Sequence, residues 1–228
     1  MKRWYFLPLT LLLTLTGVAQ SQPRPNIVYI LADDLGIGDV SVYNRAGKIK
    51  TPNIDGLART GVRFTDAHTS SAVCTPTRYG ILTGRYNWRS RLKSSVLNGY
   101  DQALIAPQRE TVAAFLKKQG YQTGVIGKWH LGWNWAASPA GSAQVDFTKP
   151  VAQSPNAYGF DYSFCIAASL DMAPYVYVEN GRSTSIPVDS CPARTGVAFY
   201  RAGIIAPDFR HEEVLPKFTE KAIGFINQ

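Results

Sequence analysis

Cys74-Thr75-Pro76-Thr77-Arg78-Tyr79-Gly80-Ile81-Leu82-Thr83-Gly84-Arg85 is the stretch around which the rest of the sequence is organised. Pro76 suits the first turn of a helix, where the amide that proline lacks would have no partner. We therefore expect a helix to begin at or just before Cys74, with Arg78 one turn further on and on the same face. The free amides and the positive dipole end of such a helix attract anions, and a guanidinium adds a planar set of donors.

A lone cysteine such as Cys74 is most often a small buried hydrophobe, and the alternative is a reactive group placed to meet an anion. A cysteine phosphatase would carry an arginine six residues after its cysteine, where this chain has Gly80. The run resembles instead the signature of the type I sulfatases, Cys-x-Pro-x-Arg closed by Thr-Gly-Arg. This resemblance implies that a formylglycine-generating (sulfatase-maturing) enzyme oxidises Cys74 to formylglycine, whose hydrated aldehyde attacks sulfur.

A second motif follows the helix expected from Glu110 to Gly120 and the strand expected from Tyr121 to Ile126. It reads Gly127-Lys128-Trp129-His130-Leu131-Gly132. In an extended segment Lys128 and His130 would share one side, which by itself is equally typical of a solvated strand end. The run resembles another sulfatase motif, which implies that Lys128 binds the sulfate and that His130 contacts the formylglycine hydroxyl.

The apolar run from Asn26 to Ala32 is typical of a strand buried on both faces of an α/β sheet. Asp33 and Asp34 follow directly, and two adjacent carboxylates at a strand end need either a solvated turn or a hard cation such as Ca²⁺. In sulfatases this pair holds calcium. The resemblance therefore implies a Ca²⁺ ligand set that includes Asp33, Asp34 and residue 74.

The alternation of helices and strands predicts an open α/β sheet with helices on its faces. The resemblance makes this the alkaline-phosphatase-like sulfatase sheet, with helices on both faces. Further elements are expected as a helix starting near Thr51 and stopping at Gly61, a strand over 62–68, a hairpin turning at Asn180-Gly181, and a helix over 211–228 with Asp208 as a possible cap. In that last helix Leu215, Phe218, Ala222, Phe225 and Ile226 share an apolar face.

The first 19 residues have the basic start, short apolar run and small residues of a secretory signal peptide. We expect a periplasmic or secreted protein without a membrane anchor. Residues 20–228 resemble the N-terminal part of a sulfatase catalytic domain, incomplete at the C-terminus. The family's second histidine, its Asp-Asn calcium ligands and a further lysine are not identified, so we expect this chain alone to be an inactive fragment.

The formal charge of +8 favours anionic partners. No clustered basic stripe points to nucleic acid, so sulfated or uronic-acid glycans fit better, although a charge that merely keeps the protein soluble is an equal alternative. Cys165 and Cys191 are candidates for a disulfide in an oxidising compartment. Trp129, Trp133 and Trp135 are expected to pack within their own domain rather than to stack on sugars, and His68 is taken as structural.

The resemblance implies hydrolysis of an aryl or carbohydrate sulfate ester. Residue 74 attacks sulfur in line, calcium neutralises sulfate oxygens, Arg78 and Lys128 stabilise the developing charge, and His130 helps the second hydroxyl lose its proton. One alternative is a phosphodiesterase or phosphonate hydrolase of the same superfamily. The other is a non-catalytic protein that binds sulfated glycans.

Overall fold

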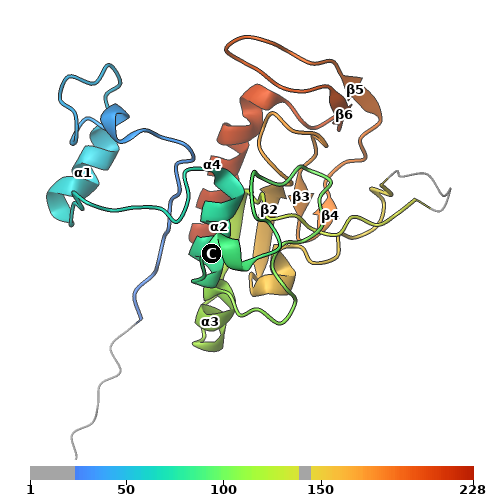
Figure 1. Ribbon diagram of the computed structural model, residues 1–228, viewed down its shortest axis with the longest axis horizontal. Helices are drawn as coiled ribbons and strands as arrows, with labels where there is room; N and C mark the ends of the chain where they lie inside the picture. Colours follow the sequence, from blue (N-terminus) through green and yellow to red (C-terminus); the bar gives the residue numbers. More distant parts are fainter. Residues whose placement is uncertain (1–23, 139–144) are drawn as a thin grey trace, which may run out of the picture. The chain divides into compact units, whose positions relative to one another are not determined.

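The computed structural model describes residues 24–138 and 145–228 (Figure 1). The expected signal peptide lies outside the described residues. Among the described residues, 24–32 belong to one compact unit and those from Asp33 onward to another. Among the described residues, no helix is both long enough and apolar enough to cross a membrane.

The prediction of a buried strand over 26–32 is wrong for this structure. Residues 24–32 contain no strand, and the side chains of Ile27, Val28, Tyr29 and Ile30 are between 58% and 81% exposed. A strand is stabilised by neighbouring strands that take up its backbone hydrogen bonds. The described residues of this first unit supply no such neighbour.

The main sheet has four strands in the order β1 (Gly124–Lys128), β2 (Tyr162–Ile166), β3 (Val178–Glu179) and β4 (Arg182–Ser183). β1 and β2 are parallel, with Lys128 opposite Ile166, and the other pairs are antiparallel. The hairpin predicted at Asn180-Gly181 is confirmed, since both residues have positive φ, as a tight two-residue turn requires. A separate two-stranded sheet joins β5 (Asp189–Cys191) to β6 (Gly203–Ile205).

Four α-helices and four short 3-10 helices complete the described elements. They are α1 (Pro52–Thr60), α2 (Cys74–Thr83), α3 (Val112–Lys118), α4 (Val214–Ile226), η1 (Ile37–Asp39), η2 (Asn87–Arg89), η3 (Pro155–Tyr158) and η4 (His211–Glu213). The prediction that a helix begins at Cys74 is confirmed, and α2 ends at Gly84 in the left-handed region, φ 64°. α3 begins after Thr111, whose hydroxyl accepts a hydrogen bond from the amide of Ala114 at 3.1 Å.

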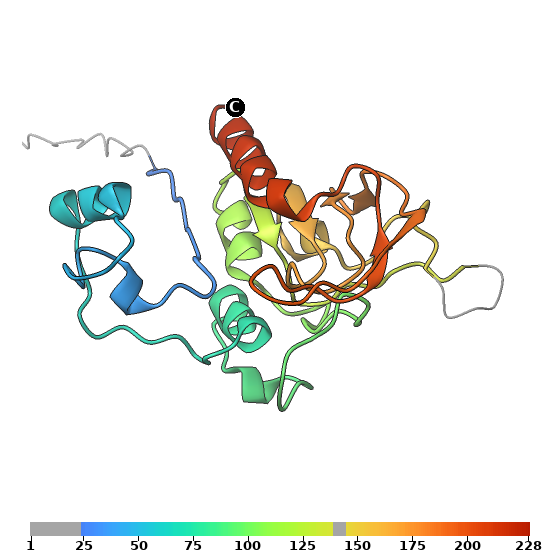
Figure 2. The same ribbon diagram turned by 90° about the horizontal axis from the view of Figure 1, so that it is seen from above.

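The two faces of β2 pack into two different apolar clusters. Phe164 and Ile166 lie in one cluster, with Val214 of α4. Cys165 and Ala167 lie in the other, with Tyr79 of α2. Figure 2 accordingly shows the sheet between α4 (red) and α2 (teal). The predicted α/β class with helices on both faces is therefore confirmed.

The apolar face predicted for the C-terminal helix is only partly covered in the structure. Phe225 stacks on Tyr162 with ring centroids 5.7 Å apart, directly over Gly124, where any side chain would collide with it. Leu215 and Ile226, expected on the same face, are 73% and 59% exposed. Asp208 does not cap α4, because its Oδ2 accepts a hydrogen bond from the Thr184 hydroxyl instead.

The disulfide expected between Cys165 and Cys191 is not formed, and both thiols are free. Cys165 is fully buried within β2 on the α2 side of the sheet, whereas Cys191 packs at the edge of the cluster on the α4 side. The sheet therefore separates the two residues. Burial raises the pKa of the Cys165 thiol to about 12, which makes it unreactive.

Two further expectations have opposite outcomes. The segment from Val62 to His68 contains no strand, so the strand predicted there is wrong.

The tryptophans pack within their domain as predicted. Trp129 and Trp133 are at most 2% exposed, and Trp135 packs edge-on against Trp133, with ring centroids 5.3 Å apart. This loop therefore presents no aromatic platform to a ligand.

Candidate active site

Side chains from three separate segments of the chain meet at Asp33. Its Oδ2 accepts hydrogen bonds from Arg78 Nε at 3.1 Å and Nη2 at 2.8 Å. Lys128 Nζ lies 3.1 Å from the same oxygen. A further guanidinium hydrogen bond from Arg78 goes to the carbonyl of Lys128, so α2 and the end of β1 are joined directly.

The electrostatics of this cluster favour the ionised carboxylate. Burial alone would raise the pKa of Asp33, but the hydrogen bonds and charges of Arg78 and Lys128 outweigh it and hold the pKa below its usual range. All three side chains are only 14–16% exposed. Two fixed cations therefore stand beside one shared carboxylate, at the edge where β1 ends.

His130 is fully buried and close enough to this cluster to feel its charges. Its Nε2 is 2.6 Å from the carbonyl of Leu97, while Nδ1 has no hydrogen-bond partner among the described residues. Burial, reinforced by the charges of Lys128 and Arg78, lowers the pKa of His130 to about 4. At neutral pH the ring is therefore uncharged, and with Nε2 donating to the carbonyl, Nδ1 carries a free lone pair.

The backbone around His130 differs from the extended geometry that the sequence suggests. β1 ends at Lys128, and His130 has a φ of 54°, in the left-handed region. Strict alternation of side chains therefore stops at Lys128. The position of the His130 ring is set instead by its contact with Leu97.

Cys74 is the first residue of α2 and is half-buried. Arg78 follows one turn later and points to Asp33. The next residue, Thr75, is fully buried, and its hydroxyl accepts a hydrogen bond from the amide of Leu97 at 3.2 Å. Leu97 thus joins the start of α2 to His130, through its amide on one side and its carbonyl on the other.

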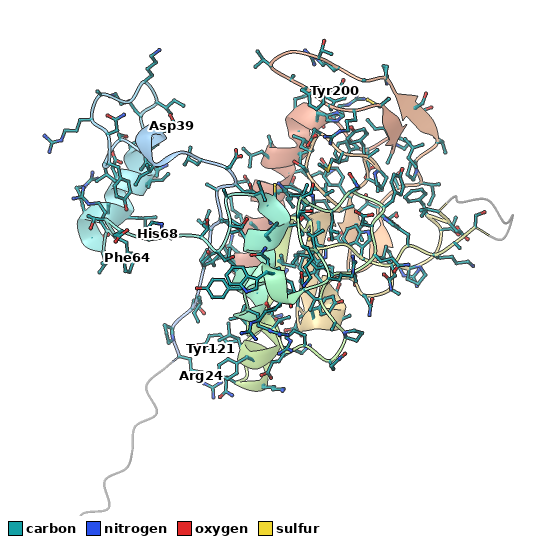
Figure 3. All side chains as sticks on the ribbon, viewed as in Figure 1. Arg24, Asp39, Phe64, His68, Tyr121 and Tyr200 are labelled. Atoms are coloured by element: carbon teal, nitrogen blue, oxygen red, sulfur yellow. The ribbon has the colours of Figure 1, made fainter. Side chains whose placement is uncertain are left out.

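Sequence reasoning missed Thr75 and Leu97 as positioning residues. Thr75 occupies a variable place in the signature, and Leu97 acts through backbone atoms, so neither side chain gives a signal in the sequence. His68 is not part of the site. Its side chain is 82% exposed and pairs with Asp66 in the stretch that follows α1 (Figure 3).

The carboxylates are of the type that calcium prefers, but they are too few. Asp33 Oδ2 already accepts two hydrogen bonds from Arg78 and forms a salt bridge with Lys128, and Asp34 is exposed. No group of three or more His, Cys, Asp or Glu residues able to hold a metal occurs within 24–138 and 145–228. Since calcium takes about 6–8 oxygens, the described residues do not by themselves make a calcium site.

Comparison with known proteins places this cluster in a family. The family model described as Sulfatase matches residues 25–195, which is most of the chain and includes Asp33, Cys74, Arg78, Lys128 and His130. The chain belongs to the sulfatase family, and the family resemblance inferred from its two motifs is confirmed.

Several curated relatives are sulfatases. The chain is 47% identical over 162 residues to an N-acetylgalactosamine-6-O-sulfatase of Bacteroides thetaiotaomicron, covering 71% of this chain and 30% of that protein. It is 33% identical to arylsulfatase G of Mus musculus, covering 90% of this chain and 38% of that protein. The chain therefore spans about a third of the length of these relatives.

Solved structures agree with the family. A sulfatase structure from work on glycosaminoglycan metabolism by Bacteroides thetaiotaomicron superposes with a TM-score of 0.75 at 35% identity, over 90% of this chain and 48% of that one. The structure of Ps i-CgsB, with a TM-score of 0.59 and 22% identity over 87% of this chain and 40% of that one, supports the fold alone.

Proposed function

We propose that this chain carries the sulfate-binding part of an active site that hydrolyses an aryl or carbohydrate sulfate ester. The observation that carries the proposal is the cluster of Arg78, Lys128 and Asp33, one helical turn from Cys74 at the start of α2. A sulfate ester bears negative charge on oxygens that two fixed cations can bind together. The named relatives act on sulfated compounds, which supports the same substrate class for this chain.

We assign a role to Cys74, to His130 and to each residue of the cluster. Cys74, once converted to formylglycine by a maturing enzyme, supplies a hydrated aldehyde as the oxygen nucleophile. Arg78 binds sulfate oxygens with a guanidinium whose direction Asp33 fixes, and Lys128 adds a second cation. The uncharged His130 ring can accept a proton at Nδ1.

For calcium, the described residues would supply only some of the ligands. Asp33 and Asp34 would contribute carboxylate oxygens, and the ion would add positive charge beside the sulfate oxygens. The remaining ligands would have to be water or groups beyond those that the structure describes. No second histidine stands at the described site to protonate a departing alcohol, so we expect no turnover by the 228-residue chain alone.

The decisive experiment is mass spectrometry of the peptide that contains Cys74, after production together with a formylglycine-generating enzyme. Conversion of the thiol to an aldehyde lowers the peptide mass by about 18 Da. An intact thiol would overturn the proposal. Cys191, which is half-buried and lies outside the motif, is the internal control and should keep its thiol mass.

Activity itself is tested in a chimaera, in which the 162-residue stretch of this chain that matches the 47% identical Bacteroides relative replaces the corresponding stretch of that protein. Faster hydrolysis of an aryl sulfate than of the aryl phosphate supports the proposal. The reverse order would favour the phosphodiesterase or phosphonate hydrolase alternative. Binding of sulfated glycans without any turnover would favour the non-catalytic alternative.

We further propose that the chain is exported to the periplasm or outside the cell by a signal peptide at residues 1–19, so that residues 20–228 form the sulfatase part. The basic start and the apolar run support this. Determination of the N-terminal sequence of the mature protein tests it, and a retained Lys2 and Arg3 would contradict it.

A further inference from the structure

A second group of cations lies at the other end of α2, around a cavity of about 330 Å³. We call this cavity the arginine pocket. Its lining residues come from α2, from the stretch of chain that follows α2 as far as Arg109, and from Gln153. Arg85, Arg89, Arg91 and Arg109 line it, and no carboxylate does.

The charge of these arginines is not neutralised by neighbouring side chains. None of the ion pairs in 24–138 and 145–228 includes any of them. Arg91 donates to the carbonyls of Gln102 and Ala103, which orients its guanidinium without removing its charge. Four like charges around one cavity repel one another unless an anion joins them.

Part of the lining of the arginine pocket is made of buried, largely apolar residues. Tyr79, Leu104 and Ile105 line it and are between 1% and 6% exposed. Guanidinium groups and apolar side chains around one cavity suit a ligand that has both charged groups and a less polar body. Planar guanidinium groups also match carboxylate and sulfate oxygens two at a time.

Two aromatic residues lie in the chain between Arg85 and Arg89, which both line the arginine pocket. Tyr86 and Trp88 are 56% and 54% exposed, and their rings are stacked with centroids 4.1 Å apart and planes 10° apart. The pair contrasts with the buried tryptophans of the loop after β1. An exposed aromatic stack offers a flat apolar face of the kind that packs against a sugar ring.

We propose that the arginine pocket and the Tyr86–Trp88 stack together form an accessory binding site for an anionic carbohydrate chain. Its sulfate or carboxylate groups would meet the arginines, and a sugar ring would lie on the aromatic stack. Cys74 is the first residue of α2 and the four arginines come after its end, about 15 Å of helix further on, so they would hold a different part of the carbohydrate chain from the ester under attack. The choice of carbohydrate rests on the proposed function, whereas the presence of an anion site does not.

The chain offers a matched control in a second basic cavity, of about 510 Å³. Arg45, Lys50, Arg59 and Arg63 line it, but so does Asp55, and no aromatic residue does. Removing two arginines there changes the total charge by the same amount as removing two from the arginine pocket. Long-range attraction of a polyanion falls equally in both variants.

The experiment is a calorimetric titration of the full chain, made without a maturing enzyme, with a heparin-derived oligosaccharide. We expect the dissociation constant to rise about tenfold in Arg89→Ala/Arg109→Ala and less than about twofold in Arg45→Ala/Arg59→Ala. Trp88→Ala keeps every charge and should weaken oligosaccharide binding about fivefold. The dissociation constant for inorganic sulfate should rise in Arg89→Ala/Arg109→Ala and stay unchanged in Trp88→Ala.

Equal losses in the two double-arginine variants would overturn the proposal, because they would show attraction by total charge alone. If Trp88→Ala had no effect and a single-stranded oligonucleotide of equal charge bound more tightly than the oligosaccharide, the ligand of this site would be nucleic acid rather than carbohydrate. Since the protein in this titration carries an unconverted Cys74, the result is independent of turnover. Failure of Cys74 conversion would refute the proposed function and leave this binding result standing.

Discussion

The cations at the two ends of α2 differ in how their charge is balanced. At the start of the helix, Arg78 and Lys128 share the carboxylate of Asp33 and are only 15–16% exposed. Beyond its end, the arginines of the arginine pocket have no carboxylate partner among the described side chains, and three of the four are exposed. One group is held in place by the protein, and the other is open to solvent.

The difference predicts different physical roles. A half-buried cation that is hydrogen-bonded to a carboxylate cannot leave its position without loss of stability, so it can hold a reacting group in one geometry. Exposed and unpaired cations contribute little to folding, but they attract anions and are screened by salt. Mutations at the two ends of α2 should therefore separate effects on folding from effects on binding.

The largest expected effect is a loss of protein stability at low pH, caused by His130, which Leu97 links to the start of α2. The folded pKa of His130 is about 4, whereas an unfolded histidine titrates near 6.5. As the pH falls from about 6.5 to 4, the histidine of the unfolded chain is protonated while the buried ring of the folded protein is not. The free energy of unfolding therefore falls by about 3 kcal/mol. Urea unfolding across this pH range measures the loss.

The variant His130→Gln should flatten that pH dependence, because glutamine does not titrate and its amide can still donate to the Leu97 carbonyl. His68→Gln is the control, since it also removes one histidine but from an exposed position. An unchanged pH profile in the His130→Gln protein would mean that the buried imidazole does not control acid stability.

Loss of Arg78 should be the next largest effect. Arg78→Ala removes the hydrogen bonds to Asp33 and to the Lys128 carbonyl, and it leaves the carboxylate with one cation. We expect the free energy of unfolding to fall by about 2 kcal/mol, and the pKa of Asp33 to rise. Urea denaturation at pH 7 tests this, with the exposed Arg182→Ala as a charge-matched control that should differ little from the wild type.

Loss of Lys128 should cost less. Lys128→Met keeps the aliphatic part of the side chain and removes only the ammonium, while Arg78 still binds Asp33. We expect destabilisation of about 1 kcal/mol. In the chimaera with the Bacteroides relative, the same variant should lower kcat for the aryl sulfate. A variant with unchanged kcat and unchanged KM would exclude Lys128 from sulfate binding.

The sequence was more informative about which side chains meet at the site than about the packing that supports them. The helix start at Cys74 follows from Pro76, a local property of the backbone. The approach of Arg78 and Lys128 to Asp33 depends on three segments far apart in the sequence, and only the family resemblance pointed to it. The contacts of Leu97 with Thr75 and His130 use the backbone atoms of Leu97, so they could not be predicted from its residue type.

The fold shows the same division between local and distant causes. The Asn180-Gly181 turn and the α1 boundaries were predicted, because turn and cap residues act on their immediate neighbours. The apolar run over 26–32 was assigned to a buried strand, yet burial depends on partner strands that its own sequence does not contain. The exposed Tyr86–Trp88 stack was missed for a related reason, since the sequence does not distinguish an exposed tryptophan from a buried one.

The smallest expected change in stability, and the sharpest test of the contrast between the two ends of α2, comes from Arg109→Ala. This side chain is exposed and lines the arginine pocket without an ion-pair partner among the described residues. Its loss relieves repulsion from the neighbouring arginines, so the free energy of unfolding should stay within about 0.5 kcal/mol of the wild type. Urea denaturation at low and at high salt measures this, and the small difference should shrink further as salt screens the charges. A loss as large as that expected for Arg78→Ala would mean that the arginines beyond α2 hold the fold together, and the distinction between a positioning end and a binding end of this helix would then fail.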